Sequence, residues 1–232
     1  DRGGFKLPDE IEDEIEEYLV SEDADPRPTG AAVGRAEVVA DATERYVAHA
    51  VSTVPGGLAG LKIAIDCGHG AATHTTPAAF EALGAEVTAI NCDWDGMDIN
   101  AGCGSTHLDV VAGLVRDGVF DLGIAHDGDA DRVLAVDETG AEVDGDRIMA
   151  VCAVDLAERG ALPGSAVVAT VMSNLGFERA LKDRGITVVK TRVGDRYVLD
   201  QMRASGATFG GEQSGHVIFL EGEPATTLYL LE

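Results

Sequence analysis

Two strands with a helix between them follow one another in the middle of the chain, and this alternation restricts the possible folds more than any other feature. The apolar run Leu61–Cys67 predicts a strand, Pro77–Leu83 a helix closed by Gly84, and Glu86–Ile90 a second strand. Strands joined through a helix lie parallel in one sheet. Between them, Gly68-His69-Gly70 is expected to form a tight turn, with a phosphate cradle as the alternative. The sequence therefore predicts an α/β fold.

The alternation resumes in the second half of the chain. Val167–Val171 and Ile186–Lys190 are predicted strands on either side of a predicted helix, Leu175–Asp183. The remaining predicted elements are the helices Thr106–Asp117, Ile148–Arg159 and Arg196–Ser205 and the short strands Thr208-Phe209 and Val217–Leu220. Asp144-Gly145-Asp146 is a turn between the two alternating regions, so a domain boundary is expected near Asp144.

The N-terminal region has another pattern. Leu7–Val20 predicts a helix with one apolar face and one acidic face, and Ser21–Gly30, which contains two prolines and several acids, predicts a linker. Val38–Val54 predicts a second helix, ended by Pro55-Gly56-Gly57. The chain begins at Asp1 without an initiator Met, which favours the interpretation that it is a fragment.

Charge and hydropathy argue against several classes of protein. The formal net charge of −24 argues against binding nucleic acid or an anionic membrane through a basic surface. No apolar run approaches the roughly 20 residues of a membrane-spanning helix. We therefore expect a highly soluble cytoplasmic protein. Its cysteines form no Cys-x-x-Cys pair and are expected to be buried thiols rather than disulfides or zinc ligands; they are Cys67, Cys92, Cys103 and Cys152.

The segment Phe120–Val136 concentrates acidic residues in a short loop between two apolar runs. Asp127, Asp129 and Asp131 alternate with small residues, and Arg132 follows at once. Three neighbouring carboxylates repel one another unless a cation neutralises them, and oxygen ligands select a hard ion, Mg²⁺ or Ca²⁺. A solvated acidic turn is the alternative. Arg132 stands where an EF-hand requires Gly, and strands flank the loop, so an EF-hand is rejected.

The histidines give weaker signals. His126 lies next to the acidic loop and is either a further metal ligand or, more simply, the last residue of a strand. The others with no identifiable partner in the sequence are His49, His69, His74 and His107.

A second polar segment, Gly210–His216, lies between two short apolar runs and is expected to form a loop at the edge of a sheet. Glu212, Ser214 and His216 alternate, so in an extended loop they would project to one side. They offer an acceptor, a hydroxyl and a titratable imidazole, which suits the binding of a polyol and the transfer of a proton. The alternative is a glycine-rich surface turn.

Asp195 and Arg196 stand at the start of a predicted helix. Asp195 can cap that helix, and Arg196 can bind a phosphate or a carboxylate. Capping alone is the simpler explanation of the pair.

Together these motifs resemble the α-D-phosphohexomutase family. Asp127–Arg132 matches its metal loop, Asp-Gly-Asp-x-Asp-Arg, and Gly211–His216 matches its sugar-binding loop, Gly-Glu-x-Ser-Gly-His. Both occur in the family's order, with Gly194–Val198 between them. Gln213 and Val193–Val198 are most similar to the bacterial branch of the family that acts on glucosamine phosphates.

The resemblance implies an α/β architecture of consecutive three-layer α/β/α domains with mixed, mainly parallel sheets, domains 2 and 3 of the family. Residues 1–37 are then the end of domain 1 with a linker, 38–143 are domain 2 with the metal loop, and 144–232 are a truncated domain 3 with the sugar loop. No Ser-His-Asn-Pro segment is present, so the phosphoserine of the family is expected to lie outside this chain.

The resemblance also implies roles for individual residues. Asp127, Asp129 and Asp131 would bind Mg²⁺, and Arg132 would neutralise charge near the transferred phosphate. Glu212 and Ser214 would hold sugar hydroxyls, and His216 would be a catalytic proton-transfer residue that also contacts the substrate. Asp195 and Arg196 would lie in an adjacent substrate loop.

The expected reaction interconverts glucosamine 6-phosphate and glucosamine 1-phosphate through a hexose bisphosphate-type intermediate, with no nucleic acid or membrane partner. The 232 residues alone are expected to lack turnover, and a homodimer is compatible with the sequence. The alternatives are the same chemistry on mannose or glucose phosphates, a non-catalytic module that binds Mg²⁺ or sugar phosphates, and a phosphatase with Asp127 as the nucleophile.

Overall fold

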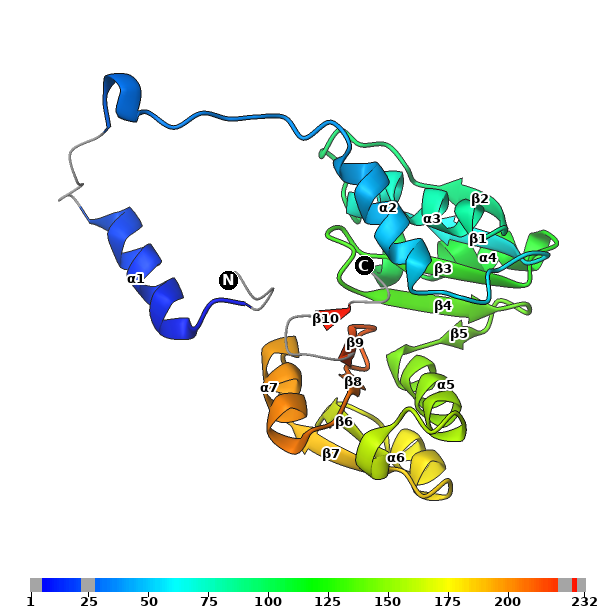
Figure 1. The fold of residues 1–232 in the computed structure, drawn as a ribbon. Coiled ribbons are helices and arrows are strands. Elements are labelled where there is room, and N and C mark those ends of the chain that lie inside the picture. Colours follow the sequence, from blue (N-terminus) through cyan, green and yellow to red (C-terminus); the bar gives the residue numbers. More distant parts are fainter. Residues whose placement is uncertain (1–5, 22–27, 221–226, 229–232) are drawn as a thin grey trace.

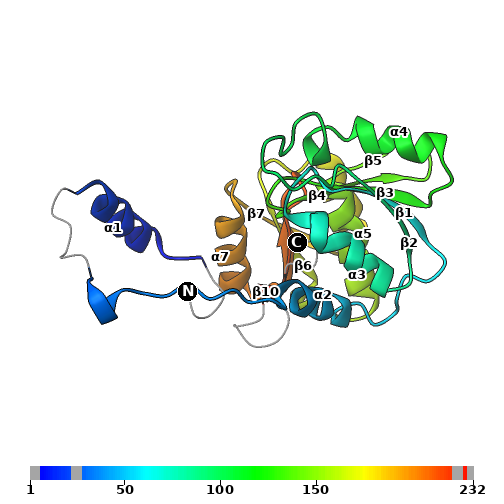
Figure 2. The ribbon, with the colours of Figure 1, turned by 90° about the horizontal axis from the view of Figure 1, so that it is seen from above.

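The computed structural model describes residues 6–21, 28–220 and 227–228. These residues include two five-stranded sheets, each with helices on both faces (Figure 1). Helix α1 (Asp9–Val20) lies apart from both sheets and is followed by the 3-10 helix Gly30–Ala32 and an extended stretch (Figure 2). No helix among the described residues is long and apolar enough to cross a membrane.

The first sheet has the strand order β2-β1-β3-β4-β5. Its strands are β1 (Lys62–Asp66), β2 (Glu86–Ile90), β3 (Leu122–His126), β4 (Val133–Asp137) and β5 (Glu142–Val143). β1 pairs in parallel with β2 and β3, whereas β3–β4 and β4–β5 are antiparallel. Parallel strands thus lie on one side of the sheet, and the acidic loop is the hairpin between β3 and β4.

Helices cover both faces of this sheet. Ile63, Ile65 and Ile124 belong to the core on one face, which includes Phe80 of α3 (Thr76–Ala82). Residues of opposite parity, such as Ala64 and Ala125, face α4 (Asp109–Asp117). Because side chains alternate along a strand, both faces of β1 and β3 are buried. Helix α2 (Ala42–Ser52) packs against α3.

The second sheet repeats this plan with the order β10-β9-β8-β6-β7. Its strands are β6 (Ala166–Thr170), β7 (Thr187–Thr191), β8 (Phe209–Gly211), β9 (Val217–Leu220) and β10 (Thr227–Leu228). β6 pairs in parallel with β7 and β8, and the other two pairings are antiparallel. Helices α5 (Gly145–Glu158) and α6 (Leu175–Lys182) cover one face, and α7 (Asp195–Ser205) covers the other.

The predicted fold class is confirmed, with one correction: in the described residues each sheet contains two parallel and two antiparallel pairings, so the sheets are mixed but not mainly parallel. Three predicted helices begin later than expected, and the first of them, expected from Leu7, begins at Asp9. The helix expected from Val38 begins at Ala42, after a turn at residues 40–41. The helix expected from Thr106 begins at Asp109, after the 3-10 helix Gly104–Thr106. β5, only two residues long, was not predicted.

The start of α6 gives a first testable prediction. Asn174 caps this helix by accepting a hydrogen bond from the Phe177 amide (2.9 Å), and its own side-chain amide donates to the buried Asp146 carboxylate (2.8 Å). Asn174→Ala should lower the free energy of unfolding by about 2 kcal/mol, because it removes both bonds. Asn174→Ser keeps a capping oxygen and should cost less. Urea unfolding measures both; equal losses would show that the cap contributes little.

Candidate functional site

The two loops singled out in the sequence meet between the two sheets. The amide of Val133, at the start of β4, donates a hydrogen bond to the carbonyl of Gly215 (3.1 Å). The amide of Gly145, at the start of α5, donates to the carbonyl of Gln213 (3.1 Å). The β8–β9 hairpin is therefore bonded to the start of β4, next to the acidic loop, and to the start of α5, where the chain leaves the first sheet.

The acidic loop brings its three carboxylates together. One carboxylate oxygen from each of Asp127, Asp129 and Asp131 lies within 4.8 Å of the others. Asp127 is buried, Asp129 is exposed and Asp131 is half-buried. Ala130, between the last two, adopts φ +61°, and its amide donates to the Asp127 carbonyl (3.1 Å), which curls the loop. The donor set consists of carboxylate oxygens only, so it fits a hard divalent cation.

Arg132 compensates part of this negative charge. Its Nε donates to Asp127 Oδ2 (2.7 Å) and lies 3.4 Å from Asp131 Oδ1, and its terminal nitrogen forms an ion pair with Asp127. Partial burial would lower the pKa of Arg132, but the two carboxylates outweigh it and raise the pKa. Arg132 therefore stays charged, and its hydrogen bonds go mainly to Asp127.

His126 supports the loop from behind. The ring is buried, with Nε2 3.3 Å from the Thr76 hydroxyl and Nδ1 3.3 Å from the Arg132 carbonyl. Burial lowers its pKa, despite the opposing effect of the Arg132 carbonyl and nearby acids. Both ring nitrogens therefore have partners within the fold. This agrees with the simpler of the two roles considered for His126, that of the last residue of a strand.

The loop at 212–216 is a turn rather than an extended segment. Gly210 and Gly211 belong to β8, and the Glu212 amide donates to the His216 carbonyl (2.8 Å), closing the hairpin. The three alternating residues consequently have different environments, contrary to prediction. Glu212 accepts a hydrogen bond from the Gly194 amide (2.9 Å), Ser214 is exposed, and His216 is buried.

His216 lies where the two loops meet, with a carboxylate near each ring nitrogen. Its Nδ1 lies 3.4 Å from Asp131 Oδ2, and its Nε2 lies 3.9 Å from Asp195 Oδ2 at the start of α7. The imidazole thus stands between a carboxylate of the acidic loop and one beside the hairpin. A proton-transfer group placed there would be oriented from both sides.

Lys6 was not predicted to belong to the site. Its ammonium group forms an ion pair with Asp195. Although burial opposes the change, the hydrogen bond and charge of Lys6, with a contribution from His216, lower the pKa of Asp195. No local pattern marks Lys6 in the sequence, because its partner follows much later in the chain.

Arg196, predicted beside Asp195, faces elsewhere. Its guanidinium group donates to Glu12 Oε1 (2.8 Å) and forms an ion pair with Asp9, so it binds the acidic face of α1. A groove of 380 Å³ lies between this part of the N-terminal segment and α7. The structure therefore brings together the three acids, Arg132, His216 and Asp195, with Glu212 at the hairpin, but not Arg196 or Ser214.

The Lys6–Asp195 pair gives a second prediction. A depressed folded-state pKa means that the pair adds stability above the ordinary pKa of an aspartate, and that this contribution is lost as pH falls through the folded-state pKa. Lys6→Met should lower the unfolding free energy at pH 7 by less than about 1 kcal/mol, because Lys6 is half-exposed. The deficit should vanish in acid. Lys62→Met, which removes an exposed pair with Glu86, is the matched control; a deficit that persists in acid would contradict the assignment.

Comparison with known proteins identifies the fold. Residues 44–140 match the family model described as phosphoglucomutase/phosphomannomutase, alpha/beta/alpha domain II, and residues 144–227 match domain III of the same family. A solved phosphoglucomutase/phosphomannomutase family protein from Burkholderia thailandensis superposes with a TM-score of 0.68 at 26% identity, over 76% of this chain and 39% of that one.

Curated relatives carry a more specific name. Phosphoglucosamine mutase of Symbiobacterium thermophilum is 54% identical over 217 residues, covering 93% of this chain and 48% of the relative. The enzyme of the same name from Streptomyces coelicolor is 55% identical over 223 residues, covering 95% and 49%. The chain spans about half the length of the curated relatives it matches. The chain belongs to the phosphoglucomutase/phosphomannomutase family and contains its α/β/α domains II and III.

Proposed function

We propose that this chain is the metal- and sugar-binding part of a phosphoglucosamine mutase, which interconverts glucosamine 6-phosphate and glucosamine 1-phosphate by way of a phosphoserine and a bisphosphate intermediate. The contact between His216 and Asp131 supports the proposal most directly, because a buried imidazole beside three convergent carboxylates would suit the transfer of a proton. Relatives above 50% identity bear this enzyme's name. The phosphoserine is proposed to lie outside the 232 residues.

Mg²⁺ is the proposed cofactor, held by Asp127, Asp129 and Asp131. When bound, it supplies positive charge to the phosphoryl group in transfer. A solved N-acetylphosphoglucosamine mutase from Aspergillus fumigatus is in complex with GlcNAc-6P and magnesium; it is 25% identical to this chain, with a TM-score of 0.58 over 78% of this chain and 38% of that one.

The other side chains of the site would position the metal ligands, transfer a proton and bind the sugar. Arg132 holds Asp127 in place and adds a fixed positive charge beside the ion site. His216, oriented by Asp131 and Asp195, would exchange a proton with the sugar hydroxyl that attacks or leaves. Glu212 would accept hydrogen bonds from sugar hydroxyls, with its second oxygen fixed by the Gly194 amide. Ser214 would also contact the substrate. Arg196 would do so once its ion pairs with α1 are broken.

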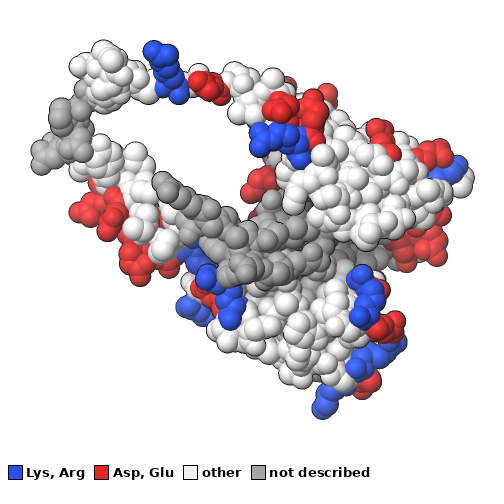
Figure 3. Space-filling model, viewed as in Figure 1, with Lys and Arg blue, Asp and Glu red and all other residues white. Residues whose placement is uncertain are grey.

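The domain limits follow the same proposal: 1–37 as the end of domain 1 with a linker, 38–143 as domain 2 and 144–232 as part of domain 3. Figure 3 shows acidic and basic side chains interspersed on the face in view, with no broad basic surface among its described residues, which supports the proposal that the chain binds neither nucleic acid nor a membrane. The proposed partner is a small sugar phosphate. The net charge of −24 supports a cytoplasmic location.

The test uses a protein extended upstream of Asp1 through the phosphoserine segment. With Mg²⁺ and a hexose bisphosphate activator, ³¹P NMR should show glucosamine 1-phosphate formed from glucosamine 6-phosphate faster than the corresponding products from mannose or glucose 6-phosphate. A preference for either hexose would overturn the substrate assignment. Release of inorganic phosphate through a phospho-aspartate at Asp127 would instead identify a phosphatase.

A further inference from the structure

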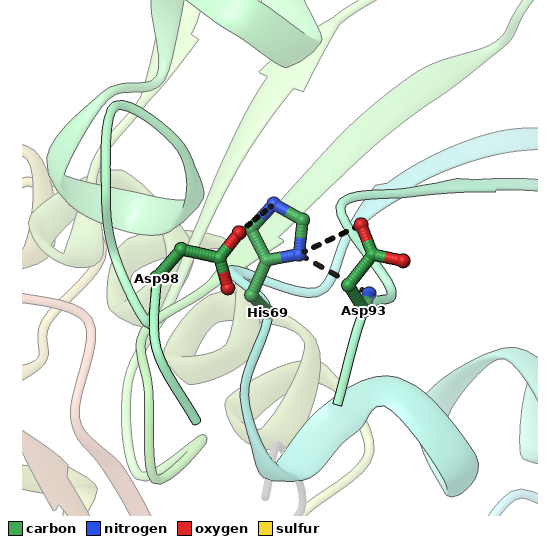
Figure 4. Close-up of side chains that lie close together, drawn as sticks. All are labelled: His69, Asp93 and Asp98. Carbon is green, nitrogen blue, oxygen red and sulfur yellow. Dashed lines mark hydrogen bonds and ion pairs between the residues drawn. The ribbon is translucent and has the colours of Figure 1, made fainter. Parts of the chain in front are cut away.

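A histidine and two aspartates form a second group of potential ligands, separate from the acidic loop (Figure 4). His69 lies in the turn after β1, and Asp93 and Asp98 lie in the loop after β2. One ligand atom from each lies within 4.8 Å of the others. His69 belongs to the predicted turn Gly68–Gly70, but no step of the proposed reaction uses the three side chains, so their convergence requires a separate explanation.

The imidazole of His69 is held in a fixed orientation. Its side chain is only 12% exposed, and its backbone amide donates to the Asn91 carbonyl (2.7 Å). Nδ1 faces Asp93: it accepts a hydrogen bond from the Asp93 amide (3.1 Å) and lies 3.7 Å from Asp93 Oδ2. Nε2 points the other way, 3.7 Å from Asp98 Oδ2.

The spacing between Nε2 and Asp98 fits two ligands of one ion. It is longer than a direct hydrogen bond. Two ligands bound at about 2.1 Å to a tetrahedral ion stand roughly 3.4 Å apart, so a shift of a few tenths of an ångström would complete the bonds. Asp98 lies in a loop with a side chain 45% exposed, which allows such a shift.

Asp98 provides an independent sign that this group of residues suits a cation. Its Oδ1 is buried and has no hydrogen-bond partner among the described residues. In the part of the chain that the structure describes, no Lys or Arg forms an ion pair with Asp98 either. A desolvated carboxylate oxygen without a donor is costly, and a bound cation would compensate it.

We propose that His69 Nε2 and Asp98 bind a divalent transition-metal ion of the zinc class, with water completing its coordination. When the ion occupies Nε2, the ring carries its proton on Nδ1, which then donates a hydrogen bond to the Asp93 carboxylate in place of the bond that it accepts from the Asp93 amide. Carboxylates hold metal-binding histidines in this way. Because imidazole favours Zn²⁺ or Co²⁺ over Mg²⁺, this site and the acidic loop would select different metals.

The location gives the ion a structural role. The Asn100 amide, two residues beyond Asp98, donates to the Gly68 carbonyl (2.9 Å), and the Ala71 amide, two residues beyond His69, donates to the Gly128 carbonyl in the acidic loop (2.9 Å). An ion bound by His69 and Asp98 would link the turn after β1 to the loop after β2. These two segments lie next to the acidic loop. Binding to the folded state alone raises its stability.

The test is a Zn²⁺ titration of the 232-residue chain by calorimetry, with excess Mg²⁺ present to occupy the acidic loop. We expect one saturable Zn²⁺ site, weakened at least about tenfold by His69→Asn and by Asp98→Asn and less by Asp93→Asn. Three control variants should leave it unchanged. His107→Asn removes an exposed histidine, Asp95→Asn removes a charge from the same loop, and Asp129→Asn alters the acidic loop.

A second readout separates ligation from folding. Zn²⁺ should shift the side-chain nitrogen signals of His69 in ¹⁵N NMR and raise the melting temperature of the wild type, and the melting temperature of His69→Asn should not respond. Circular dichroism verifies that each variant is folded. The proposal is overturned if no saturable Zn²⁺ binding occurs, if His69→Asn and Asp98→Asn bind as wild type does, or if Asp129→Asn alone abolishes binding.

Discussion

Asp129→Asn should reduce mutase turnover of the upstream-extended protein by roughly 100-fold or more, the magnitude that follows loss of a group stabilising transition-state charge. Asp129 is exposed, and its carboxylate accepts no hydrogen bond from the described residues. Its removal should therefore change the unfolding free energy by less than about 0.5 kcal/mol. The loss would then come from the cation site alone.

Two controls make this prediction specific. Glu138→Gln removes a charge from an exposed position at the far end of β4, where an EF-hand would place its last ligand, and should leave turnover unchanged. Asp127→Asn should lose both activity and stability, because Asp127 is buried and bonded to Arg132. Steady-state kinetics and urea unfolding of the same samples provide the comparison. Wild-type turnover in Asp129→Asn would refute the assigned role.

Gly215→Ala should destabilise the protein by about 3 kcal/mol and disrupt the junction of the two loops. Gly215 has φ +100°, and its carbonyl accepts the Val133 amide. A Cβ there would overlap the Val133 carbonyl and come within 3.1 Å of Leu134 Cδ2. Backbone strain and overpacking each cost of the order of 1–3 kcal/mol, so their sum should exceed either alone.

Gly206→Ala is the matched control for that substitution. Gly206 also has a positive φ, +74°, at the end of α7, but no atom lies within 4 Å of a Cβ built there. It should cost only about 1–2 kcal/mol, the strain of the left-handed conformation. Urea unfolding measures both variants. Equal losses would mean that the contact with Val133 does not constrain the hairpin.

Local sequence patterns predicted what depends on neighbouring residues. The alternation in Leu61–Ile90 identified β1, α3 and β2. The apolar run of β1 has a clear cause, because this strand is buried on both faces. The spacing of Asp127, Asp129 and Asp131 predicted their convergence, since small residues between them let one short loop curl.

Tertiary contacts decided the rest. His69 lies next to Asp98 because β1 and β2 are parallel neighbours whose ends meet at one edge, and the sequence showed no partner for it. Lys6 is far from its partner Asp195 in the sequence, and Arg196 is equally far from the acidic residues of α1. Neither contact therefore leaves a local sequence pattern. The alternation of Glu212, Ser214 and His216 failed as a guide because the residues form a turn and not an extended strand.

The central claim is that the acidic loop binds a hard cation for reaction at the junction of the two loops. Calorimetric titration of Mg²⁺ into the wild-type chain and into Asp129→Asn tests it most directly. The account predicts saturable binding of Mg²⁺ to the wild type and its loss in Asp129→Asn, with Glu138→Gln behaving as wild type. Absence of binding to the wild type, or equal binding to Asp129→Asn, would contradict it.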